Sequence, residues 1–215
     1  MTRRDAFLPL LVLGLFAAVA AAQELKPLAL PKPQTDGGRP LMQVLRDRHT
    51  TREFKPDKLP LQVLSNLLWA AFGVNRPDSG KRTAPSARNR QEIDIYVALA
   101  EGLYVYDAKA HGLNPVLAQD VRGATGGQDF VKEAPVNLVY VADLTKTGDA
   151  SPEDKNFYTA VDAGFIGQNV YLFCTSEGLA TVVRGGLDRP ALAKLMKLRP
   201  EQKILVAQTV GYPKK

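Results

Sequence analysis

The chain has 215 residues, 28 of them Lys or Arg and 22 Asp or Glu, which gives a formal net charge of +6. A single cysteine excludes a disulfide framework within one chain, and the two histidines form no Cys/His cluster for a metal. The mild positive charge suits an anionic ligand, but no long basic stripe with interleaved aromatic residues indicates nucleic-acid binding.

Residues 1–22 have the pattern of a secretory signal peptide. Arg3 and Arg4 precede an apolar run that is short for a bilayer span, and small residues lead up to Gln23. We therefore expect cleavage before Gln23, no stable membrane anchor afterwards, and a periplasmic or secreted mature chain. The arginine pair also resembles a twin-arginine export signal, so the Sec and twin-arginine routes both stay open.

The next segment, residues 23–40, is rich in proline and glycine and predicts an extended arm or linker. The folded domain is expected over residues 41–215. Its first helix starts at Leu41, and a stronger helical pattern follows Pro60 and stops at Gly73.

A small basic cluster, residues 48–52, follows the first predicted helix. Two arginines four residues apart surround two threonine hydroxyls and an imidazole, a set of groups suited to a phosphate. Short clusters of this kind also occur as solvated surface, so the pattern alone leaves both readings open.

The remaining pattern mixes strands and helices without a regular βαβ repeat, which favours an α+β domain. A long loop, of a length that is usually functional, is expected over residues 75–92. The further elements are predicted at residues 93–99 (strand), 103–106 (strand), 113–132 (polar helical region), 136–141 (strand), 157–177 (long helix), 181–183 (strand), 188–197 (helix) and 204–210 (strand).

Some single residues carry expectations of their own. The buried side of the long helix is predicted to carry Val161, Gly164, Phe165, Gln168, Tyr171 and Leu172. Cys174, on the same helix, is expected in the core, and His111 in a surface turn. His49 could equally pack against the domain or contact a ligand.

Five short segments stand in an order and spacing shared with one known family. They are Arg48-His49-Thr50-Thr51-Arg52, Pro85-Ser86-Ala87-Arg88-Asn89, residues 162–169, residues 178–186 and Gly211-Tyr212-Pro213-Lys214. Together they resemble the nitroreductase family of FMN-dependent oxidoreductases, over nearly all of residues 41–215. After Asn89-Arg90-Gln91, many members carry an aromatic residue, whereas this chain has Glu92. The strand that follows is more similar to that of the branch that contains dehydrogenases of peptide azolines.

The resemblance implies a mainly antiparallel sheet flanked by helices, with the long helix at a homodimer interface. It also implies an FMN site. The cluster would hold the phosphate and ribityl chain, the proline-serine loop would approach the flavin, and a glycine turn would place amides beside the isoalloxazine ring. The residues implied are Arg48, His49, Thr50, Arg52, Pro85, Ser86, Asn89, Gln168, Gly185, Gly186 and Lys214.

The flavin itself would carry the chemistry, so no catalytic side chain and no metal are expected. A donor such as NAD(P)H would reduce FMN and leave, and a nitroaromatic, quinone or similar small acceptor would then take the electrons. Two alternatives stay open: a dehydrogenase of a modified peptide, and a non-enzymatic FMN-binding redox partner.

Overall fold

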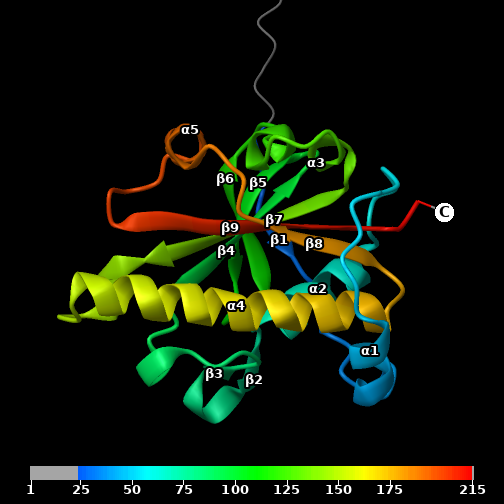
Figure 1. Ribbon diagram of the computed structural model, residues 1–215, viewed down its shortest axis with the longest axis horizontal. Helices are drawn as coiled ribbons and strands as arrows, with labels where there is room; N and C mark the ends of the chain where they lie inside the picture. Colours follow the sequence, from blue (N-terminus) through cyan, green and yellow to red (C-terminus); the bar gives the residue numbers. More distant parts are fainter. Residues whose placement is uncertain (1–23, 215) are drawn as a thin grey trace, which may run out of the picture.

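A seven-stranded antiparallel sheet forms the centre of the computed structural model, which describes residues 24–214 (Figure 1). The predicted signal peptide lies outside these described residues. The strand order is β1-β6-β5-β4-β7-β9-β8. In chain order the strands are β1 (Leu28–Ala29), β4 (Ile93–Leu99), β5 (Gly102–Asp107), β6 (Gly112–Leu117), β7 (Val136–Asp143), β8 (Ala180–Arg184) and β9 (Gln202–Gly211). The predicted α+β class and the mainly antiparallel sheet are confirmed.

Helices cover both faces of the sheet (Figure 1). They are α1 (Leu41–Asp47), α2 (Leu61–Phe72), α3 (Phe130–Glu133), α4 (Pro152–Ser176) and α5 (Arg189–Leu195). A small hairpin, β2 (Val74–Arg76) and β3 (Lys81–Arg82), lies outside the main sheet, and four short 3-10 turns complete the chain: Pro77–Ser79, Ala87–Asn89, Arg122–Thr125 and Leu144–Thr147.

The central strands are buried on both faces because each face is covered by a different set of helices. Ile95 and Val97 of β4 pack into the larger core with α2 and α4, whereas the alternate residues Tyr96 and Ala98 pack into a second core that contains Leu192 of α5. Successive side chains of a strand point to opposite faces, so this segregation follows directly from the pleat. The sheet therefore provides a rigid support for α4.

The region 113–132, predicted to be helical, is a strand in its first part and helical only at Arg122–Thr125 and from Phe130 onward. Residues 112–117 form β6, which pairs with β5 through Tyr106 and Leu113. On its other edge β6 pairs with β1, so the proline-rich arm supplies a strand of the sheet. The helical expectation failed because Asn114 and Pro115 interrupt the alternation that normally identifies a strand.

The long helix begins earlier than predicted and buries a different face. Ser151 caps it by accepting a hydrogen bond from the Asp154 amide at 3.1 Å, and Pro152 occupies its first turn. Its buried residues are Thr159, Asp162, Ala163, Ile166, Gly167, Val170 and Cys174, which confirms the core position of Cys174. Gly164, Phe165 and Gln168 are exposed instead, because small and apolar residues occur on every side of α4 and periodicity does not single out one.

His111 is not a simple surface residue. Its backbone has φ +50°, as in a turn, but its ring is half-buried between α2 and β5. One ring nitrogen lies 2.7 Å from the Ser65 hydroxyl, and the other lies 3.0 Å from the Tyr106 hydroxyl. Burial lowers the pKa of His111.

Candidate functional site

The basic cluster is held in place by backbone hydrogen bonds to two segments that are distant in sequence. The Thr51 amide donates to the Thr181 carbonyl of β8 at 3.1 Å, and the Lys214 amide donates to the Glu53 carbonyl at 3.2 Å. Buried Phe54 pairs with Pro213 in an isolated bridge. The fold thus brings Lys214 to the segment that carries Arg52, as the predicted site requires.

Tyr171 of α4 joins the side chains of the cluster to the rest of the domain. The Arg48 guanidinium lies over its ring, 5.3 Å from the centroid, and Thr50 Oγ1 lies 3.1 Å from its hydroxyl. The same hydroxyl accepts a hydrogen bond from the Val183 amide at 3.0 Å. Sequence reasoning placed Tyr171 only on a buried face, because nothing in one chain reveals a partner 121 residues away.

In the described part of the chain, the two arginines of the cluster are not paired with acidic side chains. Within residues 24–214, neither Arg48 nor Arg52 forms an ion pair with a carboxylate. The nearby Asp47 carboxylate bonds Arg39 and Arg46, and these hydrogen bonds lower its pKa. Unpaired guanidiniums beside a threonine hydroxyl fit the phosphate of a flavin nucleotide.

Two further predicted site residues, His49 and Lys214, have exposed side chains. One ring nitrogen of His49 lies 2.8 Å from the Asp47 carbonyl oxygen, which turns the imidazole back toward α1. The Lys214 ammonium lies 3.7 Å from a Glu133 carboxylate oxygen, a loose and exposed pair that an incoming anion could compete with.

A hollow of about 440 Å³ lies next to the cluster, and its lining includes Tyr171, which contacts Arg48 and Thr50. One wall is α4, with Gly164, Gly167 and Gln168, and the other wall comes from β8 and β9, with Val183 and Leu205. No atom lies within 4 Å of where a Cβ on Gly164 would stand, so α4 presents bare backbone there. Gln168 lines the same hollow as Tyr171, which contacts the cluster.

The glycine turn after β8 is open on its outer side. Gly185 and Gly186 are exposed, and a Cβ on either would meet nothing within 4 Å. Gly186 borders a further hollow with the loop that contains Gly126 and Gly127. A flat ligand could therefore reach the backbone of this turn without displacing side chains.

Arg184, next to this turn, is a buried cation that the sequence did not reveal. It donates to the Thr125 carbonyl at 2.6 Å, to Asn137 Oδ1 at 2.9 Å and to Thr209 Oγ1 at 3.1 Å. Burial lowers the pKa of Arg184 to about 10, which still leaves it charged at neutral pH. It fastens the loop at residues 122–127 to the sheet, and a Cβ on Gly126 would stand 1.9 Å from its Nη1.

The proline-serine loop, residues 85–91, has a strained backbone. Arg88, Asn89 and Gln91 all have positive φ, between 49° and 55°. The Gln91 amide donates to Ser86 Oγ at 2.7 Å, and the Ala87 amide donates to Asp162 Oδ2 on α4 at 2.9 Å. Pro85 and Asn89 are exposed. Such strain persists only where neighbouring contacts enforce it, and it is frequent at ligand-binding loops.

The structure does not bring this loop to the basic cluster within one chain. The loop contacts α4 at Asp162 and the cluster contacts it at Tyr171, nine residues further on. At a rise of about 1.5 Å per residue these points lie roughly 13 Å apart along the helix, and they project from opposite sides of it. Along α4 the predicted residues therefore form two groups, the cluster with Lys214 and the separate loop, while Gln168 lines the hollow beside Tyr171 and Gly185 and Gly186 lie in the turn after β8.

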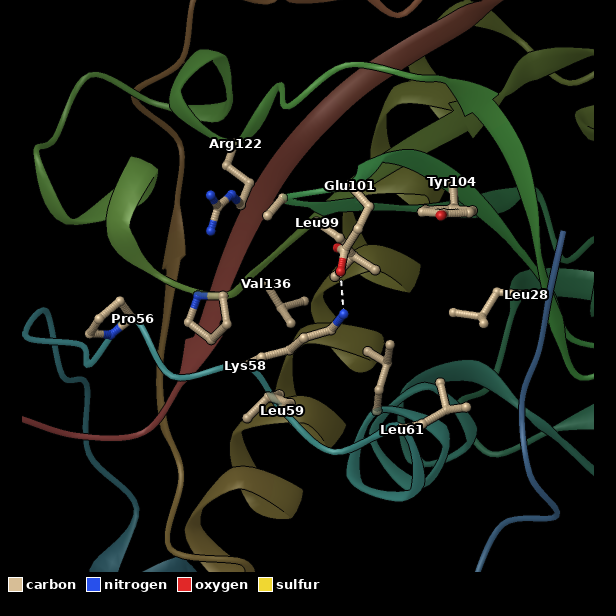
Figure 2. A pocket seen from close by; sticks show the side chains of 13 residues that line it. Leu28, Pro56, Lys58, Leu59, Leu61, Leu99, Glu101, Tyr104, Arg122 and Val136 are labelled. Atoms are coloured by element: carbon tan, nitrogen blue, oxygen red, sulfur yellow. Dashed lines mark hydrogen bonds and ion pairs between the residues drawn. The ribbon is translucent and has the colours of Figure 1, made fainter. Parts of the chain in front are cut away.

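None of the predicted residues lines the hollow of about 320 Å³ shown in Figure 2. Its walls are mainly apolar, and Leu28 of the N-terminal arm contributes to one side. An ion pair between Lys58 and Glu101 lies across it. In the described part of the chain, no helix is both long and apolar enough to cross a membrane, and no group of three or more metal-ligating side chains is present.

Comparison with known proteins identifies relatives over most of the domain. The model of the nitroreductase family matches residues 45–212. A candidate nitroreductase of Methanocaldococcus jannaschii, MJ1384, is 31% identical in an alignment of 169 residues that covers 74% of this chain and 85% of that protein.

Two solved structures resemble the whole described fold. A candidate nitroreductase of Ralstonia eutropha JMP134 is 42% identical, with a TM-score of 0.85 over 98% of this chain and 97% of that one. The Escherichia coli microcin synthetase McbBCD complex, solved with truncated pro-MccB17 bound, contains a chain with 20% identity and a TM-score of 0.71, over 96% of this chain and 85% of that one. The latter similarity concerns the fold alone.

Proposed function

This chain belongs to the nitroreductase family of oxidoreductases, and we propose that it uses FMN to pass electrons from a donor to a nitroaromatic, quinone or similar small acceptor. The observation that carries the proposal is the basic cluster. Arg48 and Arg52 have no carboxylate partner among the described residues, and they flank a threonine hydroxyl next to the 440 Å³ hollow.

The side chains around the site bind and position the cofactor. The two guanidiniums and the Thr50 hydroxyl would hold the phosphate, and each charge-assisted hydrogen bond contributes about 1.5 to 3 kcal/mol to retention of the cofactor. The amides of Gly185 and Gly186 would stabilise negative charge on the ring, because preorganised donors act strongly where water is excluded. FMN, when bound, supplies the hydride and electron transfer.

We propose further that the site is completed by a second copy of the chain. Three aromatic side chains of α4, Phe157, Tyr158 and Phe165, are 40–61% exposed, and Leu41 and Met42 of α1 are 59% and 76% exposed. A homodimer that covers these residues could place the proline-serine loop of one protomer near the basic cluster of the other. This arrangement would overcome the separation of the two groups along α4.

A direct test uses the full mature chain. The purified protein is reconstituted with FMN and reduced anaerobically with NADPH or NADH, and a nitroaromatic or menadione is then added. Bleaching of the flavin absorbance by the donor and its recovery on addition of the acceptor would support the proposal. Flavin that binds but stays oxidised with both donors would favour the role of a redox partner fed by another donor.

The dimer is tested by mixing two variants that each bind FMN more weakly than the wild type. Arg48→Ala damages the cluster and Asn89→Ala damages the loop, so a heterodimer of the two contains one intact site if each site uses both protomers. Recovery of FMN binding in the mixture would support the shared site. No recovery, with light scattering showing that dimers had exchanged, would contradict it.

A second function follows from the resemblance of the strand after Glu92 to the branch that contains dehydrogenases of peptide azolines. In that reading the modified peptide is the electron donor: the flavin oxidises it, is itself reduced, and is reoxidised by a separate acceptor. Adding azoline-containing peptides to the donors of the reduction assay separates the two functions, because only a peptide dehydrogenase would show flavin bleaching by the peptide.

Export remains a proposal of its own, based on the pattern of residues 1–22. Sequencing the N-terminus of the protein recovered from the periplasm or medium tests it. A mature chain that begins at Gln23 is the expected result, and an unprocessed chain found only in the cytoplasm would contradict it.

A further inference from the structure

Two carboxyl side chains meet in the interior beneath the proline-serine loop. Glu92 ends the loop just before β4, and Asp162 lies in the middle of α4. Their residues are 1% and 2% exposed, respectively. The Asp143 amide donates to the Glu92 carbonyl at 2.9 Å, which fixes the Glu92 backbone at the edge of the β4–β7 pair.

Both carboxyl groups hold the loop directly. Asp162 Oδ2 accepts from the Ala87 amide at 2.9 Å, and the Ser86 hydroxyl donates to Glu92 Oε2 at 3.4 Å. Ser86 Oγ in turn accepts from the Gln91 amide at 2.7 Å. The strained segment is thus attached to the two carboxyl groups at Ser86 and Ala87, and its other end, Gln91, is joined to them through the Ser86 hydroxyl.

Within residues 24–214, neither Glu92 nor Asp162 forms an ion pair with a basic side chain. Of the charged neighbours, Arg90 on the loop is half-exposed, Asp94 on β4 pairs with Lys146 at 2.7 Å, and the Asp143 carboxylate on β7 pairs with Arg199 at 2.6 Å. Burial raises the pKa of Glu92, and the adjacent Asp162 carboxyl raises it further. Two carboxylates in contact without a cation cannot both be ionised at low cost.

We propose that Glu92 and Asp162 share one proton, and that this proton fastens the proline-serine loop to α4, so that its loss at raised pH loosens the loop. A protonated Glu92 can donate a hydrogen bond to Asp162, whose other interactions are with the Ala87 amide. Deprotonation replaces that bond by repulsion between two buried charges. Both residues act through the loop and position it.

The sign of the pH effect follows from the direction of the shift. The folded chain holds a proton at Glu92 that the unfolded chain releases near its ordinary value of 4.5. The folded state therefore binds more protons than the unfolded state above that pH, and stability falls as pH rises until the pair has lost the proton. FMN affinity should fall in parallel, a consequence that rests on the proposed contact between the loop and the flavin.

The test compares the wild-type protein with Glu92→Gln, which keeps the shape and the donor but cannot lose the proton. Glu101→Gln, at an exposed carboxylate, is the matched control. The free energy of urea unfolding of the flavin-free protein and the dissociation constant of FMN are measured between pH 5 and 9. The wild type and the control should lose stability and FMN affinity as pH rises, with a limiting slope of about tenfold in FMN affinity per pH unit for one proton.

Glu92→Gln should flatten both pH profiles, and equal slopes in Glu92→Gln and wild type would overturn the proposal. If FMN does not bind at all, the unfolding profile still decides whether the proton is shared, which separates this proposal from that of the flavin site. If Glu92→Gln does not fold, two measurements on the wild type remain. As pH rises, hydrogen exchange of the residue 86–91 amides should accelerate by more than the ordinary pH dependence of amide exchange, and an infrared band of a buried protonated carboxyl should disappear over the same pH range. Absence of that band throughout would overturn the proposal.

Discussion

The basic cluster and the carboxyl pair contact the same helix, α4, yet they hold their charges in opposite ways. Arg48 and Arg52 stand at the surface and contact no carboxylate in the described chain. Glu92 and Asp162 are almost fully buried, and their carboxyl groups accept hydrogen bonds from Ser86 and Ala87 of the loop. An open charge of this kind is available to a ligand, whereas a buried one is committed to holding the fold.

This difference predicts which substitutions alter cofactor binding and which alter the free energy of unfolding. Changes in the cluster should alter cofactor binding and leave the fold intact, because the backbone hydrogen bonds that position it do not depend on its side chains. Changes to buried charged groups should alter the free energy of unfolding first.

The largest expected effect is that of Arg184→Leu, which leaves acceptors at Thr125, Asn137 and Thr209 without their charged donor. We expect a loss of about 3 to 5 kcal/mol in the free energy of unfolding, since each lost charged hydrogen bond costs about 1.5 to 3 kcal/mol. Urea denaturation measures it, with Arg52→Leu at an exposed site as the control. A loss below about 1 kcal/mol would mean that Arg184 does not fasten the loop at residues 122–127.

Arg48→Ala removes one of the two guanidiniums of the basic cluster. It should weaken FMN binding roughly tenfold to a hundredfold, the equivalent of about 1.5 to 3 kcal/mol, and change the free energy of unfolding by less than about 0.5 kcal/mol. Fluorescence titration and urea denaturation of the same preparation give both values. Unfolding of the variant together with loss of binding would assign Arg48 a structural role through Tyr171 instead.

His111 is a second, half-buried titratable group, and its effect on stability has the opposite pH dependence to that of Glu92. Burial lowers the pKa of His111, so its contribution to stability is complete above the unfolded value and is lost as pH falls below about 6.5. His111→Asn, which tolerates the positive φ, should remove this acid-side decline in stability. Thermal denaturation between pH 5 and 7 checks it, and an unchanged decline would assign it to other groups.

The smallest effect is expected for the ion pair in Figure 2. Lys58 and Glu101 have side chains that are 75% and 45% exposed, so Lys58→Ala should cost less than about 1 kcal/mol of stability. Added salt should reduce the difference from wild type further. A cost that is larger and insensitive to salt would show that this pair resembles the buried groups.

Regular elements with strong patterns could be predicted from the sequence, and contacts between distant segments could not. The leucine stripe of α2 and the alternation in β4 and β7 identified them correctly. β6 was missed because its pairing with β5 and the arm outweighs a weak local pattern, and α4 misled because apolar side chains occur on all of its sides.

The candidate site shows the same division. The cluster was recognisable because its chemistry lies within five consecutive residues, 48–52. Tyr171, Arg184 and the Glu92–Asp162 contact were not, because each depends on segments that only the folded chain brings together. The separation of the loop from the cluster also required the three-dimensional structure.

One measurement tests the central claim most directly: titration of the wild-type protein with FMN and with riboflavin, which lacks only the phosphate, followed by flavin fluorescence. If the uncompensated guanidiniums at residues 48 and 52 hold the phosphate, FMN should bind at least about a hundredfold more tightly than riboflavin, and added salt should narrow the gap. Equal affinity for both flavins, or no uptake of either, would contradict the account.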